Sequence, residues 1–410
     1  MSRHLLRATV LLCLVGSATA LARPYPGITG LAATADSPQT AGNNPAGIVR
    51  FSEPSLDVEI MWFSSQSEWK SSFSESDVVF NSKDSGDTIV PRVAYVHPLT
   101  DNLAASFTFL GASFSDDLGN WPGRYFITEY DSLYVNAFPS LAYRINDQWS
   151  VAGSAIISYT SFEQERAIAN IFDVGLADGT SELEADSVEF GFGLSALYQH
   201  TERTRFGLTY QSEIEPERDA DISYNNLGPN TELVMEQAGI FDADVTLEAV
   251  SPASMTAGIY HEFENAHAVT LDFAWIQFSD FVLSEYYFNG EALAETSVDY
   301  DDIYAVAASY TFPVSDRWML GVGGLATNEM VDDDERTMTL RLDALWSLGV
   351  AAEWQWTESR TVSVSLAYMG VGDAPVRTGE IQGLGSLEGE FDSRDTWLFQ
   401  VGMTWGEPDN

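Results

Sequence analysis

Strict alternation of apolar with small or polar residues is the feature that most constrains this chain. The segment SVEFGFGLSALYQ (187–199) places Val188, Phe190 and Phe192 on one face, and glycines, serines and a glutamate on the other. Successive side chains of a strand point to opposite faces of a sheet, so this period of two predicts a strand with one apolar face. The same pattern recurs at 149–159, 269–275, 346–356, 362–368 and 397–405.

The connections between such segments alternate in length. Short polar turns, such as PLTDN (98–102) and TER (201–203), alternate with much longer segments. Outer-membrane barrels are built in this way, with short periplasmic turns, long outer loops and an even number of strands. We therefore predict an all-β fold, a transmembrane antiparallel β-barrel of about 14 strands; a soluble sandwich is the alternative. The strands are expected to begin near residues 55, 89, 103, 131, 148, 187, 204, 252, 268, 302, 317, 345, 361 and 394.

The N-terminus has the layout of a signal peptide. Arg3 and Arg7 precede a short apolar core, and an A-x-A site follows, which predicts a signal peptide at 1–22. The sole cysteine, Cys13, lies inside it, so the mature chain forms no disulfide. A closed barrel needs none, because every strand edge is paired.

The mature chain is strongly acidic. It has 17 basic residues against 61 acidic ones, a formal charge of −44. Nucleic acid is excluded as a partner, since binding phosphates needs the opposite charge. A fatty-acid carboxylate approaching acidic outer loops would be repelled unless cations screened it, whereas neutral hydrocarbons would not. The runs DYDD (299–302) and VDDDER (331–336) offer oxygen ligands for calcium but lack EF-hand spacing, so a solvated acidic face is favoured and no metal or cofactor is predicted.

Residues 23–51 show no alternation and end in AGNNPAGIVRF. In this stretch Asn43 and Asn44 can bond neighbouring backbone, Pro45 fixes one φ, and Gly47 permits a sharp exit. An ordinary turn leading into the first strand would also explain it. A fourteen-strand barrel, however, is an open channel unless something fills it. We therefore predict a plug, or hatch, at 23–51, followed by the barrel with long extracellular loops at 52–410.

The chain resembles the FadL family of outer-membrane transporters for long-chain fatty acids and other hydrophobic compounds. Asn44, Pro45 and Ala46 match the family's Asn-Pro-Ala hatch motif. The resemblance implies an outer-membrane location in a Gram-negative bacterium, a hatch that gates the lumen, and a lateral gap in the wall, for which Gly111 and Pro139 are candidates. Pro139 also requires a bulge or break in its ladder. The implied partners are a hydrophobic small molecule, the outer membrane and its lipopolysaccharide, and the protein is expected to be a monomer. Further segments carry the resemblance at 138–159, 251–281, 303–324 and 341–354.

Two outer loops carry apolar clusters, and the family places an external hydrophobic groove between its third and fourth loops. Residues 163–179 and 231–241 are read as short helices, each with one apolar face. We interpret the two clusters as the walls of that groove; helices that merely cap the rim are the alternative. The predicted groove residues are Ile168, Ile171, Phe172, Leu176, Leu233, Val234, Met235 and Phe241.

No pattern indicates catalysis. GFGLSA (191–196) lies within an alternating strand and opens no helix, so it is not a dinucleotide site. No G-x-S-x-G elbow occurs, and the four mature histidines stand at strand ends or turns. We therefore predict no catalytic residue and no enzyme, but a passive transporter in which cargo passes from the loop groove to a lumen pocket behind the hatch. A general porin and a surface adhesin or structural barrel are the alternatives.

Overall fold

The computed structural model describes residues 29–73, 79–117, 119, 124–125, 127–215, 217–242, 245–280, 282–288, 291–292, 300–332, 344–357, 359–371, 374–381 and 385–406. The predicted signal peptide, residues 23–28 of the predicted hatch and most of the acidic run at 331–336 lie outside these residues.

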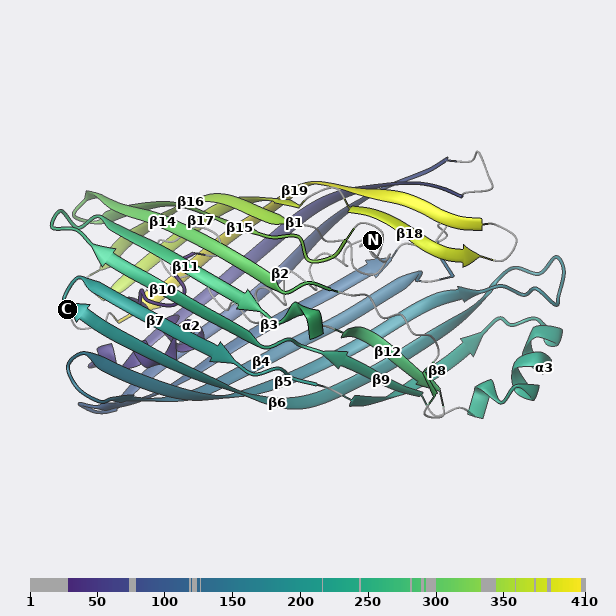
Figure 1. Ribbon diagram of the computed structural model, residues 1–410, viewed down its shortest axis with the longest axis horizontal. Coiled ribbons are helices and arrows are strands. Elements are labelled where there is room, and N and C mark those ends of the chain that lie inside the picture. The colour runs from purple at the N-terminus through teal and green to yellow at the C-terminus, as the bar shows by residue number, and fades with distance from the viewer. Residues whose placement is uncertain are drawn as a thin grey trace.

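Within the described residues, nineteen strands form one sheet, and fourteen of them close into a barrel (Figure 1). The closing pair is β1 with β19, in which Leu56 lies opposite Trp405. The first and last wall strands therefore meet at the same rim, and the fourteen-strand antiparallel barrel is confirmed. The wall strands in ring order are β1 (Ser55–Phe73), β2 (Val79–Thr100), β3 (Leu103–Asp117), β4 (Glu129–Arg144), β5 (Trp149–Ile168), β6 (Gly179–Thr201), β7 (Thr204–Gln211), β10 (Ser254–Glu262), β11 (Ala268–Ile276), β14 (Ile303–Ser315), β15 (Trp318–Thr327), β16 (Leu345–Thr357), β17 (Arg360–Val371) and β19 (Gly385–Trp405).

The long connections contain more strand than the sequence predicted. β5 and β6 stay paired as far as Ile168 and Gly179, well past the apolar band. Once two wall strands are paired, each further residue pair adds backbone hydrogen bonds without the entropy cost of closing a new loop. This favours extension of the two strands. Five additional strands lengthen the outer end of the wall: β8 (Glu217–Asn225), β9 (Val245–Val250), β12 (Val282–Phe288), β13 (Glu291–Ala292) and β18 (Ala374–Ile381).

Burial follows the predicted alternation. Phe190, for example, is 70% exposed on the outer face, whereas Gly193 on the other face of the same strand is buried. Aromatic rings gather near the short turns, where Trp149 stacks on Tyr198 at 4.6 Å between ring centroids. An apolar outer face bounded by aromatic rings is the surface that a membrane-spanning barrel presents to lipid.

Two interruptions of the wall ladder lie at the residues that the sequence singled out. Between β4 and β5 the pairing skips Phe138 and Pro139 and resumes in the same register, which confirms the predicted break at the proline. Between β2 and β3 the pairing ends at Arg92↔Leu110, although both strands continue and stay paired to their other neighbours. Gly111 is the first β3 residue beyond that end.

The described helices are short. They are α2 (Thr40–Asn43), η1 (Pro45–Arg50), α3 (Pro229–Gln237), η2 (Ile240–Asp242) and η3 (Phe278–Asp280). α3 lies at the opposite end of the barrel from the C-terminus, and α2 lies in the half nearer the C-terminus (Figure 1). None of the helices in the described ranges is long and apolar enough to cross a membrane.

Candidate transport path: the lumen segment and the outer loops

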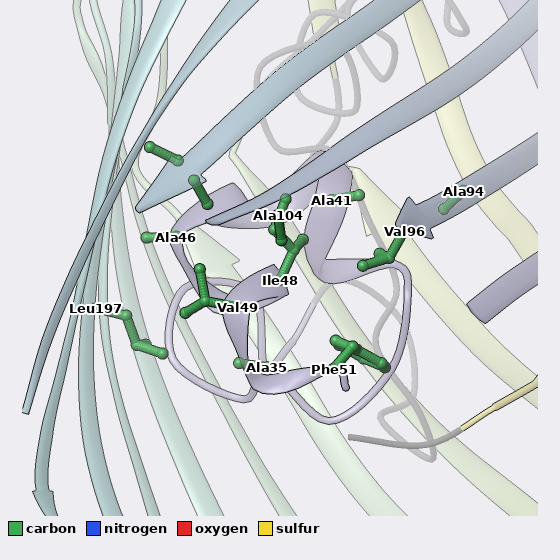
Figure 2. Close-up of a cluster of buried hydrophobic side chains, with 12 residues drawn as sticks. Ala35, Ala41, Ala46, Ile48, Val49, Phe51, Ala94, Val96, Ala104 and Leu197 are labelled. Carbon is green, nitrogen blue, oxygen red and sulfur yellow. The ribbon is translucent and has the colours of Figure 1, made fainter. Parts of the chain in front are cut away.

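Residues 29–51, hereafter the N-terminal segment, pack against the inner faces of the wall strands. Small side chains make this close approach possible, because alanines lie on both sides of the contact. Its apolar residues form one buried cluster with inward residues of β2 to β6 (Figure 2). The members are Ala35, Ala41, Ala46, Ile48, Val49, Phe51, Ala94, Val96, Ala104, Ala142, Ala152 and Leu197.

The Asn-Pro-Ala turn bonds both to the segment and to the wall. Asn44 precedes η1, and its Oδ1 accepts the N–H of Ala46 at 3.1 Å, as a turn-forming asparagine should. Its Nδ2 donates to the carbonyl oxygens of Ala32 at 2.6 Å and Ala196 at 3.1 Å. Ala46 in turn bonds wall hydroxyls, since Ser195 accepts its N–H and Ser150 donates to its carbonyl. The motif therefore joins the turn directly to β5 and β6.

Asn43 also contacts the wall, and Gly47 differs from expectation. The Oδ1 of Asn43 accepts from Arg92 of β2 at 3.2 Å, so it contacts the wall. Gly47 lies within η1 and is not among the glycines with positive φ, so the predicted sharp exit at this residue is wrong. Its role is close packing, because a Cβ there would lie 2.6 Å from the Cβ of Ala35 and 2.7 Å from Oγ1 of Thr40.

Charged wall residues hold the backbone of the N-terminal segment. Arg205 of β7 donates to the carbonyls of Ala33 and Thr34, and its guanidinium stacks 4.0 Å from the ring centroid of Tyr260. Asp272 of β11 accepts three consecutive backbone N–H groups at 2.7 to 3.2 Å, those of residues 30–32. Charge-assisted bonds of this kind are stronger than neutral ones. Sequence reasoning missed these residues, although a lone charge at an inward position of an alternating strand was a usable signal.

A small cavity separates α2 from the wall. The space open to the centre of a water molecule is about 10 Å³, which holds one water at most. Its lining is partly hydroxylic and partly apolar, and it comes from the N-terminal segment and from β4 to β7. The lining residues are Ala41, Gly42, Pro45, Phe138, Ser154, Ile156, Gly193, Leu194, Ser195, Thr209 and Gln211.

The predicted helix in the third outer loop is wrong. β5 runs on to Ile168, and residues 169–178 form turns before β6 begins. Gly175 adopts a φ of +92°, which a helix does not accommodate. Ile168 therefore belongs to the wall, apart from the other predicted groove residues of that loop.

The fourth outer loop does contain a helix, α3, and the third loop caps it. Asp173 accepts the N–H groups of Asn230 at 3.1 Å and Thr231 at 2.8 Å, so a carboxylate from one loop caps the helix of the other. Gly228, just before α3, leaves room for it, because a Cβ there would lie 2.3 Å from Oδ2 of Asp173. Burial by itself raises the pKa of Asp173, but the hydrogen bonds from Thr231 and Asn230 outweigh it, so that pKa lies below its ordinary value.

The apolar side chains of these two loops are exposed. Ile171 is 70% exposed, and Phe172, Leu176, Leu233, Val234 and Phe241 are exposed as well, while Met235 is half-buried. Phe241 contacts Tyr224 of β8 edge-on at 5.3 Å. Except for Ile168, the predicted groove residues therefore lie on two loops that Asp173 joins.

The geometry is that of a membrane barrel whose lumen is occupied by its own N-terminal segment. A family profile described as outer membrane protein transport protein (OMPP1/FadL/TodX) matches residues 15–405. The chain belongs to this family. A long-chain fatty acid transport protein of Escherichia coli O6:H1 is 24% identical to this chain. The alignment, 424 residues long with its gaps, covers 95% of this chain and 92% of the relative.

Solved structures of the family share the fold. A FadL homologue of Pseudomonas aeruginosa superimposes with a TM-score of 0.79 at 16% identity, covering 92% of this chain and 96% of that one. The toluene transporter TodX of P. putida superimposes with a TM-score of 0.65 at 13% identity, covering 94% and 97%. Family membership confirms the outer-membrane location in a Gram-negative bacterium and the role in transport rather than catalysis.

Proposed function

We propose that this protein takes up hydrophobic molecules passively, with residues 29–51 as the hatch. Two of the similar proteins reported above are named as transporters, one of long-chain fatty acids and one of toluene. The observation that carries the proposal is the N-terminal segment, which is buried in the lumen and bonded to β2, β5, β6, β7 and β11. A general porin needs an unobstructed lumen, which this arrangement does not favour.

The cargo is captured by the exposed apolar residues of the third and fourth loops and then passes down to the cavity beside α2. That cavity has no room for cargo as it stands, so α2 and the Asn-Pro-Ala turn must move. An exposed apolar patch that spans two loops usually marks a binding surface.

The lateral exit is the end of the β2–β3 ladder, beside Gly111. Unpaired backbone is tolerated in a membrane protein where it borders a cavity or a path. Arg92 is the last paired β2 residue, and it donates to the carbonyl of Gln39 and to Asn43. Movement of α2 would therefore displace the side chain of Arg92, which lies where the pairing of β2 with β3 ends.

Two further partners follow from the outer surface. Asp131, Glu163, Glu184 and Asp221 lie opposite one another across β4, β5, β6 and β8, just beyond the apolar band. Divalent cations held by this acidic row would bridge it to the phosphates of lipopolysaccharide. The protein acts as a monomer, because a closed ring leaves no strand edge for a second copy to pair with.

Deleting residues 29–50 tests the hatch. In liposomes, the intact protein should admit no small sugar, while cells that express it take up a hydrophobic probe. The deletion should admit the sugar, as an unplugged fourteen-strand barrel would. Sugar influx through the intact protein would favour the porin. Absence of hydrophobic uptake by intact protein would reject the transport proposal.

A further inference from the structure

Family membership leaves the cargo open, because the relatives include transporters of an anionic and of a neutral compound. The two classes need different binding sites. A carboxylate taken out of water requires a cation or several free donors, since an uncompensated buried charge is strongly disfavoured. A hydrocarbon, alcohol or ester requires only apolar surface and at most one hydrogen bond.

Among the described residues, the cavity beside α2 offers a carboxylate no cation, because none of those that line it is charged. Two of its hydroxyl groups are engaged, since Thr209 donates to the carbonyl of Asn43 and Ser154 bonds Ser140 at 2.7 Å. Ser195 accepts from Ala46, so its O–H and the amide of Gln211 can still donate, but both are neutral donors and supply no cation. The remaining surface, from Phe138 and Ile156, is apolar.

The arginines around the N-terminal segment are bound to its backbone. Arg205 and Arg144 donate to the carbonyls of residues 33–34 and 49, and Arg50 donates to Ala35 and to the side chain of Gln199. Each would have to leave its partner to bind cargo.

Among the described arginines, Arg92 is the one that would attract a carboxylate, because its Nε and Nη1 have no hydrogen-bond partner within the described residues. Asp57 and Glu59 of β1, however, lie close enough to act on its charge. Both acids are buried, and Gln39 donates to each of them. Two buried carboxyl groups therefore already act on the one charge of Arg92, which leaves it a poorer partner for an added carboxylate.

The outer surface at the loop end of the wall is acidic as well. Carboxylate oxygens of Glu163, Glu182 and Glu184 lie within 4.8 Å of one another. Arg124 is paired with Asp178 of the third loop at 2.9 Å. Negative charge thus precedes the lumen as well as lining part of it.

From these observations, and resting on the proposed function, we infer that the cargo is an uncharged hydrophobic molecule whose neutral end enters the cavity beside α2, and that carboxylates are discriminated against there. Carboxylates are disfavoured in two ways. The negative charge at the outer end slows their approach, and the cavity binds them weakly because it offers no cation.

Two ligands with the same chain isolate the head group. Radiolabelled oleyl alcohol and oleate are dialysed against the full mature protein in detergent at about pH 8, where a carboxyl is ionised, with empty micelles as the blank. We expect the alcohol to bind at least about tenfold more tightly, because the carboxylate loses its hydration without gaining a cation. Acidification that protonates oleate should narrow this difference. Equal or tighter oleate binding, abolished by Arg92→Gln, would overturn the inference and place the head group at Arg92. Absence of saturable binding by either ligand would instead overturn the proposed function.

A cation added to the cavity tests whether the head group of the cargo binds there. Gln211→Arg should raise oleate affinity about tenfold, the effect of one favourable charge-assisted contact, and leave the alcohol unchanged. Gln211→Met is the matched neutral control and should leave the ratio of affinities unchanged. Ser154→Lys supplies the same charge from β5 if the first variant fails to assemble. No gain of oleate binding in a correctly assembled cation variant would show that the head group lies elsewhere and overturn the assignment.

Discussion

The N-terminal segment and the two outer loops are both held by aspartates that accept backbone N–H groups, yet the two regions differ in their surroundings. Asp272 works in the buried lumen together with arginines and an apolar cluster. Asp173 lies at the outer end, where it and Thr231 are buried but most of the apolar side chains of the two loops are exposed to water. Hydrogen bonds shielded from water are stronger and more costly to break. The lumen segment should therefore resist opening, while the loops should open readily.

The largest expected effect comes from Asp272→Ala. Three buried N–H groups lose a charged acceptor, so the free energy of opening residues 30–32 should fall by about 3 kcal/mol. Amide hydrogen exchange of Leu31 and Ala32 in the detergent-solubilised protein measures this. Asp272→Asn, which keeps one acceptor, should lose less. Unchanged exchange in the alanine variant would mean that Asp272 does not hold the segment.

Gly47→Ala should weaken the same segment by packing alone. The new Cβ would lie 2.6 Å from that of Ala35, and overpacking of this kind costs about 1–3 kcal/mol. Thermal unfolding and exchange of the segment's amides report the loss. Gly153→Ala is the control, because nothing lies within 4 Å of a Cβ at that position. Equal behaviour of the two variants would contradict the role given to Gly47.

Asp173→Ala should release α3 at a smaller cost, as expected for loss of a helix cap. Exchange at Asn230 and Thr231 should quicken, while residues 30–32 stay protected. Because the folded-state pKa of Asp173 is lowered, the cap is fully present above its ordinary pKa and is lost as pH falls through the lowered value. If α3 stays docked in the variant at neutral pH, the inter-loop cap is not what holds it.

The smallest effect concerns the acidic row. Burial and the neighbouring Glu182 and Glu184 raise the pKa of Glu163 to about 7. The folded state then binds the proton more tightly than the unfolded state, so stability declines as pH rises from the ordinary pKa through about 7. Glu163→Gln should remove this decline from the outer ends of β5 and β6, with little change at low pH. Thermal scans across that range compare the variant with the parent protein, and parallel curves would reject the repulsion.

The barrel wall could be predicted from the sequence because the alternation that specifies each wall strand is a local property of that strand. A period of two fixes which side chains face lipid, and Phe190 and Gly193 lie on the sides that their positions require. Pro139 predicted its own break in the ladder, since it has no N–H to donate. Asn44 and Pro45 identified the turn for a similar reason, because their backbone preferences are intrinsic.

Contacts between distant segments had no such local signal. The helix expected at 163–179 is absent because pairing of β5 with β6 outweighs the helical spacing of apolar residues, and the cap on α3 comes from a residue more than fifty positions earlier. Arg205 and Asp272 acquire their roles only when the closed ring brings β7 and β11 against residues 29–36. The sequence by itself determined the barrel, its strand count and its acidic surface, because these follow from alternation and composition. Only the tertiary structure decided which charged lumen side chains bind the N-terminal segment, because the closed ring brings β7 and β11 against it. It also decided where β2–β3 pairing ends, because beyond Arg92 and Leu110 each strand pairs only with its other neighbour.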